Sequence, residues 1–276
     1  MSFLSAVAIA EKRIGRKGEG VYSGRSRVVL ERSWIQFKSS AWMVVASGFI
    51  EPLLNLVVFG FGVGQFIGEI KLENGISVSY ASYVVPGLLA SAAMMGAIMD
   101  ATWNVFFKIH ESRLYHAMLA TSLGPMDVAL GEISWALGRG VMYSTAFMIV
   151  VTPLGLVKSW WALLAIPAGV VIGFGFAALG MALTSYMSSF HHLNWINFVL
   201  LPLTLFSGSF FPLSILPHWL EAIMRCTPLT QGIDLMRMLT LGTVDASIFI
   251  HIIYFSLFVI GGLYFTTRRL NALFMK

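Results

Sequence analysis

Charged side chains are scarce in this sequence. Asp, Glu, Lys and Arg make up only 11% of the 276 residues, whereas 57% are hydrophobic, and the mean hydropathy is +0.80. Soluble globular domains carry about 25% charged residues, so this composition excludes that class. Several apolar stretches reach the roughly 20 residues with which a helix crosses a bilayer. The sequence therefore predicts an all-α polytopic membrane protein.

Two further absences narrow the function. Cys226 is the only cysteine, so no intramolecular disulfide can form. No glycine-rich loop ending in Gly-Lys-Ser/Thr, the pattern that cradles nucleotide phosphates, occurs anywhere. Any work driven by ATP must then be powered by another chain, and we expect no cofactor in this one. The apolar run 3–10 is short and basic residues follow it, so we also expect no cleavable signal peptide.

Six stretches are apolar and long enough to span a membrane. They cover residues 41–62, 83–107, 133–156, 161–187, 193–210 and 248–267. Before them, residues 1–40 hold a basic, glycine-rich tail and then a segment, 25–38, without any helix breaker. In that segment Val28, Trp34 and Ile35 recur at helical intervals among Arg and Glu. This pattern is typical of an amphipathic helix that lies on the membrane surface.

The basic residues set the expected orientation. Eight of the 18 Lys and Arg residues precede the first span, and six more fall in loops or ends on the same side. The four that remain on the other side are Lys71, Lys158, Arg225 and Arg237. Because Lys and Arg concentrate in cytoplasmic segments, we expect a multi-pass protein of the inner membrane with both termini in the cytoplasm. The membrane thus accounts for the net charge of +5, and we expect no nucleic-acid partner.

The segment 211–245 is broken by prolines and yet remains apolar. Pro212, Pro217 and Pro228 are too many for one straight helix, since an interior proline removes a hydrogen bond and clashes with the preceding turn. The stretch around Trp219 is nonetheless amphipathic. We expect this segment to lie outside the cytoplasm, between spans five and six, and to dip back toward the membrane.

Three Asp, Glu, Lys or Arg residues fall within the predicted spans, namely Glu51, Asp100 and Arg139. A charge that faces lipid at mid-depth costs about 2.5–3.5 kcal/mol, so we expect protein or water around each of them. Asp100 and Arg139 lie at similar depths, which favours an ion pair. Glu51 precedes a proline in span one, and the sequence leaves open whether it lines a path or caps internal structure.

Aromatic residues gather near the outer end of span five. Phe206, Phe210, Phe211 and Trp219 belong to this group. An interfacial aromatic belt is the default interpretation. A gate that contacts substrate is the sharper alternative, because sugar rings and acyl chains both suit aromatic surfaces.

Signatures of enzymes are weak in this sequence. His110 opens a pattern like H-E-x-x-H, but the next histidine, His116, lies six positions on and on another helix face. His191 and His192 have no acidic residue nearby, and the serines of segment 207–209 lack the preceding glycine of a nucleophile motif. A membrane-embedded lipid or glycosyl transferase would need clustered Asp, His or Glu at the membrane surface. The sequence has no such cluster, so transport is the better interpretation.

Three stretches resemble type-2 ABC exporter permeases. That family's cytoplasmic loop is matched by residues 108–133, KIHESRLYHAMLATSLGPMDVALGEI, through MLAT, the Pro and the final Gly-Glu. Its signature before the last span is matched by residues 207–237, SGSFFPLSILPHWLEAIMRCTPLTQGIDLMR. The first span, with IEPL at 50–53 and VFG at 58–60, is similar to the nodulation-factor export branch. The chain is therefore identified as a member of this family.

The resemblance implies a six-span subunit that dimerises with a second copy of itself or with a homologous permease. Two separate ABC ATPase subunits would hold ATP and Mg, and the cytoplasmic loop 108–132 would contact them. Segment 211–245 would form two short re-entrant helices, about 213–225 and 229–241. The coupling residues that the match implies are Glu111, Arg113, Leu114, Met118, Leu119, Ala120 and Thr121.

The implied function is ATP-driven export of an amphipathic or lipid-linked substrate, such as a glycolipid, a polysaccharide or a lipo-oligosaccharide. Export of an antibiotic or another drug-like molecule is the alternative within the same class. Membrane lipids would surround the subunit. The candidate residues of the translocation path and gate are Glu51, Phe206, Phe210, Phe211 and Trp219.

Overall fold

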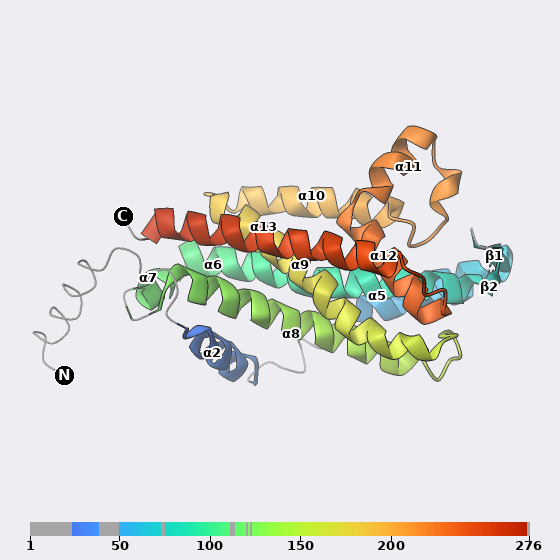
Figure 1. Cartoon of the computed structure of the whole chain (residues 1–276), viewed down its shortest axis with the longest axis horizontal. Helices are drawn as coiled ribbons and strands as arrows, with labels where there is room; N and C mark the ends of the chain where they lie inside the picture. Colours follow the sequence, from blue (N-terminus) through green and yellow to red (C-terminus); the bar gives the residue numbers. More distant parts are fainter. Residues whose placement is uncertain are drawn as a thin grey trace, which may run out of the picture.

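The computed structural model describes residues 24–38, 50–72, 75–110, 114–119, 121 and 123–274. Long helices run side by side along one axis of the molecule (Figure 1). Within the described ranges, the one sheet is a two-stranded hairpin. The all-α fold class that the composition predicts is confirmed.

The helices and strands fall into two halves of the chain, one that ends at Val151 and one that begins at Trp160. The first group contains α2 (Ser26–Lys38), a helical run Ile50–Ile67 with the π-helical turn η1 (Leu56–Val63) and α4 (Gly64–Ile67), the strands β1 (Glu69–Lys71) and β2 (Ser77–Ser79), α5 (Tyr80–Met99), the π-helical turn η2 (Asp100–Asn104), α6 (Val105–His110), α7 (Leu114–Leu119) and α8 (Pro125–Val151). The second group contains the 3-10 turn η3 (Trp160–Leu164), α9 (Ala165–Tyr186), α10 (His191–Phe206), the 3-10 turn η4 (Leu213–Ile215), α11 (His218–Arg225), α12 (Pro228–Leu241) and α13 (Ile248–Phe274).

Among the residues that the structure describes, five helical runs are long and apolar enough to cross a membrane. They are Ile50–Ile67, Tyr80–His110, Pro125–Val151, Trp160–Tyr186 and Ile248–Ala272. The stretch expected as span five falls on α10, which has 16 residues and is shorter than the others. The protein is therefore a multi-pass membrane protein, while a count of six spans stays a prediction. The first part of the expected span 41–62 lies outside the described residues.

Three expected boundaries differ from the structure. Helix α10 ends at Phe206 instead of continuing to residue 210, because Gly208 adopts a φ of 83°, which a helix cannot contain. The helix expected at about 213–225 is two elements, η4 and α11, and Pro217 separates them at the start of α11. The loop after the first span is ordered as a hairpin in which Glu69 pairs with Ser79.

Small residues let the central helices approach closely. Helix α5 is buried along almost its whole length against α8, α9 and α12. A Cβ added at Gly140 of α8 would lie 3.1 Å from the carbonyl oxygen of Ala93 in α5. A Cβ added at Gly262 of α13 would lie 2.6 Å from the Cβ of Ala178 in α9. Small residues have this role in membrane bundles, where close van der Waals packing holds helices together.

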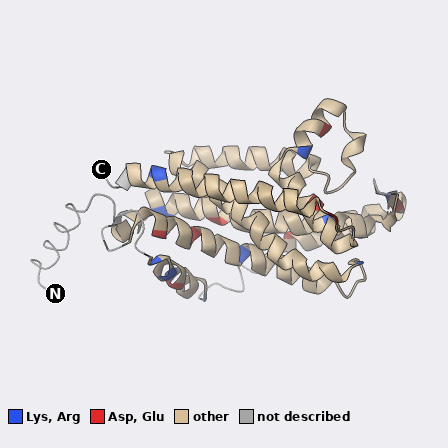
Figure 2. Ribbon diagram, in the orientation of Figure 1, with Lys and Arg blue, Asp and Glu red and all other residues tan. Residues whose placement is uncertain are grey.

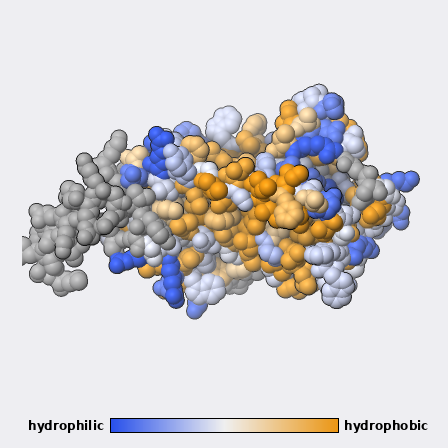
Figure 3. Space-filling view, in the orientation of Figure 1, coloured by the Kyte–Doolittle hydropathy of each residue, from blue (hydrophilic) through white to orange (hydrophobic). Residues whose placement is uncertain are grey.

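The two ends of the bundle differ in charge. We call the end with α2, α7 and the C-terminal part of α13 the basic end, since the Lys and Arg positions of the ribbon, coloured blue, gather there (Figure 2). The opposite end, with β1, β2, α11 and α12, is the cap end (Figure 1). Between them, hydrophobic side chains cover most of the visible face, whereas hydrophilic residues lie toward both ends (Figure 3). This distribution is the one expected for a bundle that spans a bilayer.

Helix α2 packs across the start of α8 at the basic end. Val29 is fully buried there, and a Cβ added at Gly131 of α8 would lie 2.5 Å from the Val29 Cβ. Trp34 and Phe37 contact Trp135 of α8, with ring centroids 6.3 and 5.5 Å from it. The predicted helix 25–38 is therefore present. One face of it is attached to the bundle, and apolar side chains on the other face remain exposed.

Candidate functional site

A cavity of about 370 Å³ opens on one face of the bundle, between the run Ile50–Ile67, α5, α8 and α10. We call it the inner cavity. Its polar lining residues are Glu51, Asn55, Ser91, Arg139, Tyr143, Asn197 and Thr204. Its apolar wall is formed mainly by Leu88, Met95, Met99 and Phe210. A polar floor and an apolar wall at membrane depth suit a ligand that carries both kinds of surface.

An ion pair borders the inner cavity. Arg139 of α8 places its Nη1 atom 2.7 Å from Oδ1 of Asp100, as the similar depths of the two residues predict. Nη2 of Arg139 donates to the Tyr143 hydroxyl at 2.9 Å, and the amide of Asn104 donates to Asp100 at 2.9 Å. Asp100 is almost fully buried, whereas 22% of the Arg139 side chain is exposed. The guanidinium is thus held in place and still reaches the cavity.

The run that carries Asp100 is not a regular α-helix. Asp100–Asn104 forms a π-helical turn between α5 and α6, and Thr102 donates to the carbonyl oxygen of Ile98 at 2.7 Å. Such turns are rare, and they occur frequently at functional sites. The sequence holds no signal for this turn, because its residues fit a regular helix equally well.

Glu51 lies at the edge of the same cavity, in the first helical run. Its side chain is exposed, and it makes no ion pair or hydrogen bond with the described part of the chain. A carboxylate at membrane depth without a partner needs water, ligand or another subunit next to it. Of the two roles that the sequence left open, this position fits a residue that lines a path.

The predicted gate aromatics divide into two sets. Phe210 lines the inner cavity and contacts Phe59, with ring centroids 4.4 Å apart. Phe206, Phe211 and Trp219 are not among the lining residues. The structure therefore brings Phe210 together with Glu51 and Arg139, but it leaves the other three aromatics outside the cavity.

The loop that carries Phe210 is fixed by hydrogen bonds from α5 and α12. The hydroxyl of Tyr80 donates to the carbonyl oxygen of Phe210 at 2.9 Å, and the hydroxyl of Tyr83 donates to that of Gly208 at 3.1 Å. Nη2 of Arg237 donates to the same Gly208 oxygen at 2.9 Å. These bonds satisfy loop carbonyl groups that no helix pairs. We call residues 207–210, of which Phe210 lines the inner cavity, the lid.

The predicted coupling residues that the structure describes lie on α7 or directly after it, at the basic end (Figure 1). Met118 and Leu119 are each 8% exposed and pack into the bundle, and Leu114 is partly buried against the same cluster. Thr121 is exposed and donates to the Met118 carbonyl oxygen at 2.6 Å. The remaining candidates, Glu111, Arg113 and Ala120, lie outside the described residues. Leu114, Met118 and Leu119 thus pack α7 against the rest of the bundle.

A buried ion pair beneath α7 was missed from sequence. Nζ of Lys108 lies 2.6 Å from Oε2 of Glu132, and the two side chains are 6% and 2% exposed. The ring of Tyr115, on α7, is fully buried. Burial, and then the negative charge of Glu132, raise the pKa of the Tyr115 hydroxyl well above its usual range, so it stays neutral. A separation of 24 positions along the chain hides the contact of Lys108 with Glu132 in the sequence.

A family model described as ABC-2 type transporter matches residues 25–241. The chain belongs to the ABC-2 type transporter family. This multi-pass inner membrane permease is 29% identical to "Nodulation protein J" of Rhizobium leguminosarum bv. viciae, over 90% of this chain and 94% of that protein. It is 27% identical to "Nodulation protein J" of Sinorhizobium fredii, over 84% and 87%. It is 24% identical to "Inner membrane transport permease YadH" of Escherichia coli, over 79% and 85%.

Metal-dependent chemistry finds no support in the described residues, since no group of three His, Cys, Asp or Glu among them could hold a metal ion. His191 and His192 open α10 and are exposed. The inner cavity is the place where the structure brings the predicted residues Glu51, Arg139 and Phe210 together.

Proposed function

We propose that the permease exports an amphipathic saccharide, either lipid-linked or acylated, from the cytoplasm. The inner cavity is the observation that carries this proposal. The carboxylate of Glu51 and the side-chain amides of Asn55 and Asn197 suit sugar hydroxyls, while Met95 and Phe210 suit an acyl chain. The resemblance to the nodulation-factor export branch and the relatives named Nodulation protein J support the same substrate class.

The basic end faces the cytoplasm in this proposal. Lys and Arg residues of α2 and of the end of α13 then lie where the positive-inside rule expects them. The cap end, with α11 and α12 as re-entrant helices, faces outward. Six spans result if α10 crosses the membrane together with residues 207–210.

A second copy of the chain closes the inner cavity. The cavity opens at the side, and the helical run beside it exposes Leu54, Val57, Val58 and Phe61. Packing this face against its equivalent would enclose Glu51 and place the path at a two-fold interface. A homologous permease could take the same position.

Two ABC ATPase subunits, which hold ATP and Mg, dock at α7 in this proposal. Tyr115 and Leu119 attach α7 to the bundle, and the Lys108–Glu132 pair joins α6 to α8 beneath it. A displacement of α7 by the ATPases would therefore move the helices that carry Asp100 and Arg139. Buried ionic contacts of this kind resist local deformation and move as a unit.

Reconstitution tests the proposal. The permease and its ATPase are placed together in proteoliposomes, and ATP-dependent transfer of a fluorescent acylated oligosaccharide across the bilayer is measured. We expect transfer that requires ATP and both subunits. Transfer of a cationic drug-like dye in place of the acylated sugar would support the antibiotic-export alternative and contradict the saccharide assignment. Sugar modification that needs no ATPase would instead indicate a transferase.

A further inference from the structure

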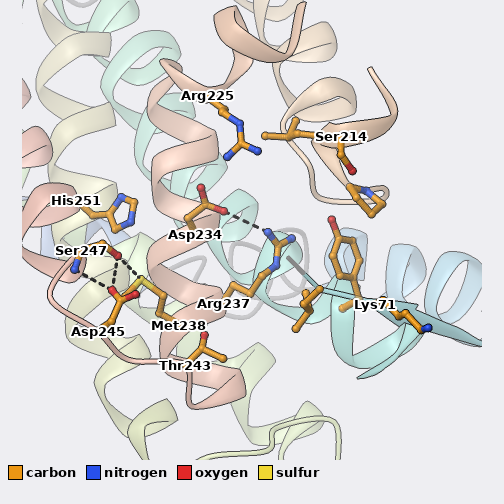
Figure 4. Close-up of a pocket in the computed structure, with 14 residues that line it drawn as sticks. Lys71, Ser214, Arg225, Asp234, Arg237, Met238, Thr243, Asp245, Ser247 and His251 are labelled. Atoms are coloured by element: carbon orange, nitrogen blue, oxygen red, sulfur yellow. Dashed lines mark hydrogen bonds and ion pairs between the residues drawn. The ribbon is translucent and has the colours of Figure 1, made fainter. Parts of the chain in front are cut away.

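A second cavity, of about 420 Å³, lies at the cap end between α11, α12, the loop around residues 212–214 and the start of α13. We call it the outer pocket (Figure 4). Arg225, Asp234 and Arg237 line one part of it, and Lys71 reaches it from β1 on the side opposite Asp245 and His251 (Figure 4). No role was predicted from sequence for any of these residues.

The basic residues of the cap end are concentrated in this pocket. Lys71, Lys158, Arg225 and Arg237 are the four Lys and Arg residues that the sequence places at that end. Three of the four line the outer pocket, and Lys158 does not. They come from β1, α11 and α12, which are far apart in the chain. The fold therefore collects them at one place in a region that is otherwise poor in positive charge.

Acidic side chains balance these charges. Asp234 lies 3.2 Å from Nη1 of Arg237, and Glu221 lies 2.8 Å from Nη2 of Arg225. Asp245 accepts hydrogen bonds from the Ser247 hydroxyl at 2.5 Å and from the Ser247 backbone N–H at 2.8 Å. These two bonds lower the pKa of Asp245, so this carboxylate is ionised at neutral pH. The outer pocket thus presents both signs of charge without a clear excess of either.

This balance selects the chemistry of the ligand. An anionic group beside the two arginines would also meet Asp234, which pairs with Arg237, and a cationic group would meet the arginines. A sugar hydroxyl donates to a carboxylate and accepts from a guanidinium at the same time, so a neutral saccharide satisfies both kinds of side chain. The volume is within the range of small-molecule pockets.

We propose that the outer pocket is a binding site for the neutral saccharide part of the exported molecule. The inference rests on the proposed saccharide export and adds a second site on the exit side of the lid. Arg237 connects the two sites, because it lines the outer pocket and also donates to the Gly208 carbonyl oxygen at 2.9 Å. The sugar is held there after the acyl chain has left the inner cavity.

Saturation-transfer NMR on the complete transporter in nanodiscs tests this site. The probes are neutral tetrasaccharides of glucose and of N-acetylglucosamine without an acyl chain, and glycerol phosphate as the anionic probe. We expect a tetrasaccharide to bind and glycerol phosphate to give no signal. The Asp234→Asn and Arg237→Lys variants should weaken sugar binding about tenfold, because each disturbs a charged hydrogen-bonding partner. The Asp234 side chain is 34% exposed, so the Asp234→Asn protein should fold normally.

Two controls separate the outcomes. Lys158→Gln changes a basic residue of the cap end that does not line the outer pocket, and should leave sugar binding unchanged. Transfer of the acylated sugar in proteoliposomes tests the export proposal, whereas loss of the NMR signal in Asp234→Asn tests the outer pocket, so each proposal can fail while the other stands. Equal sugar binding by wild type and by Asp234→Asn, or binding of glycerol phosphate alone, would overturn the inference.

Discussion

Two buried ion pairs of this permease lie in contrasting surroundings. Lys108 and Glu132 are sealed at the basic end, with side chains 6% and 2% exposed. Asp100 is equally buried, but its partner Arg139 is 22% exposed and borders the inner cavity. The sealed pair can only hold α6 to α8. The open pair joins the turn η2 to α8, and it also presents a charged group to a molecule in the cavity. The exposed fraction of Arg139 therefore distinguishes an ion pair that can serve transport from a purely structural one.

Breaking the sealed pair is expected to have the largest effect on stability. The Lys108→Met variant leaves the buried carboxyl of Glu132 without its cation, which should lower the free energy of unfolding by about 3–5 kcal/mol. Thermal unfolding of the purified protein in detergent measures this loss. The double variant Lys108→Met with Glu132→Leu should recover most of it, because neither charge then remains buried. Equal unfolding temperatures for the single and double variants would show that the pair is not sealed.

Breaking the open pair should have a smaller effect on stability and a larger one on transport. Asp100→Asn is expected to lower the free energy of unfolding by about 1–3 kcal/mol, because Arg139 keeps its bond to Tyr143 and some solvent. The rate of transport in proteoliposomes should fall by more than this loss of stability accounts for. Exchanging the two charges, Asp100→Arg with Arg139→Asp, should restore part of the transport. A complete lack of rescue would contradict a functional ion pair.

A third variant, Gly87→Ala, displaces the lid, whose Phe210 lines the same cavity as Arg139 of the open pair. A Cβ added at Gly87 of α5 would lie 2.7 Å from the Cα of Ser209, so Gly87→Ala must displace the 207–210 loop. We expect a loss of about 1–3 kcal/mol in unfolding free energy together with uncoupled ATP hydrolysis. Gly138→Ala is the matched control, since a Cβ there meets nothing within 4 Å. If ATP hydrolysis stays coupled to transport in the Gly87→Ala variant, the lid has no role in the mechanism.

The smallest effect on stability is expected for Glu51→Gln. Glu51 is exposed and lacks a partner among the described residues, so unfolding free energy should change by no more than about 0.5 kcal/mol. Transport of the acylated sugar should nevertheless weaken about tenfold, through loss of a charged acceptor. Measuring the free energy of unfolding and the transport rate on one preparation separates a role of Glu51 in the path from a role in stability. A large loss of stability would mean that Glu51 caps internal structure.

The sequence predicted what depends on composition and local pattern. Long apolar stretches gave the positions of α5, α8, α9 and α13, and the pattern around Trp34 gave α2. Asp100 and Arg139 were paired correctly, because charges at equal depth in neighbouring helices have few other partners.

Tertiary contacts account for what sequence could not predict. The contact of Lys108 with Glu132 depends on how α6, α7 and α8 fold back on one another. The lid depends on hydroxyls of Tyr80 and Tyr83 that meet carbonyl groups about 130 residues away. The outer pocket assembles residues from β1, α11 and α12, and none of them carries a local motif.

Thiol labelling tests the central claim, that the inner cavity is a water-filled path for the exported molecule. Cys226 is exposed, so the Cys226→Ser protein supplies the background for Glu51→Cys and for Leu257→Cys, whose position on α13 is 65% exposed but outside the inner cavity. A charged methanethiosulfonate reagent is applied to the complete transporter in liposomes. We predict rapid labelling of the Glu51→Cys protein, slowed by the acylated oligosaccharide, and no labelling of Leu257→Cys. Labelling of Glu51→Cys as slow as that of Leu257→Cys would contradict the account.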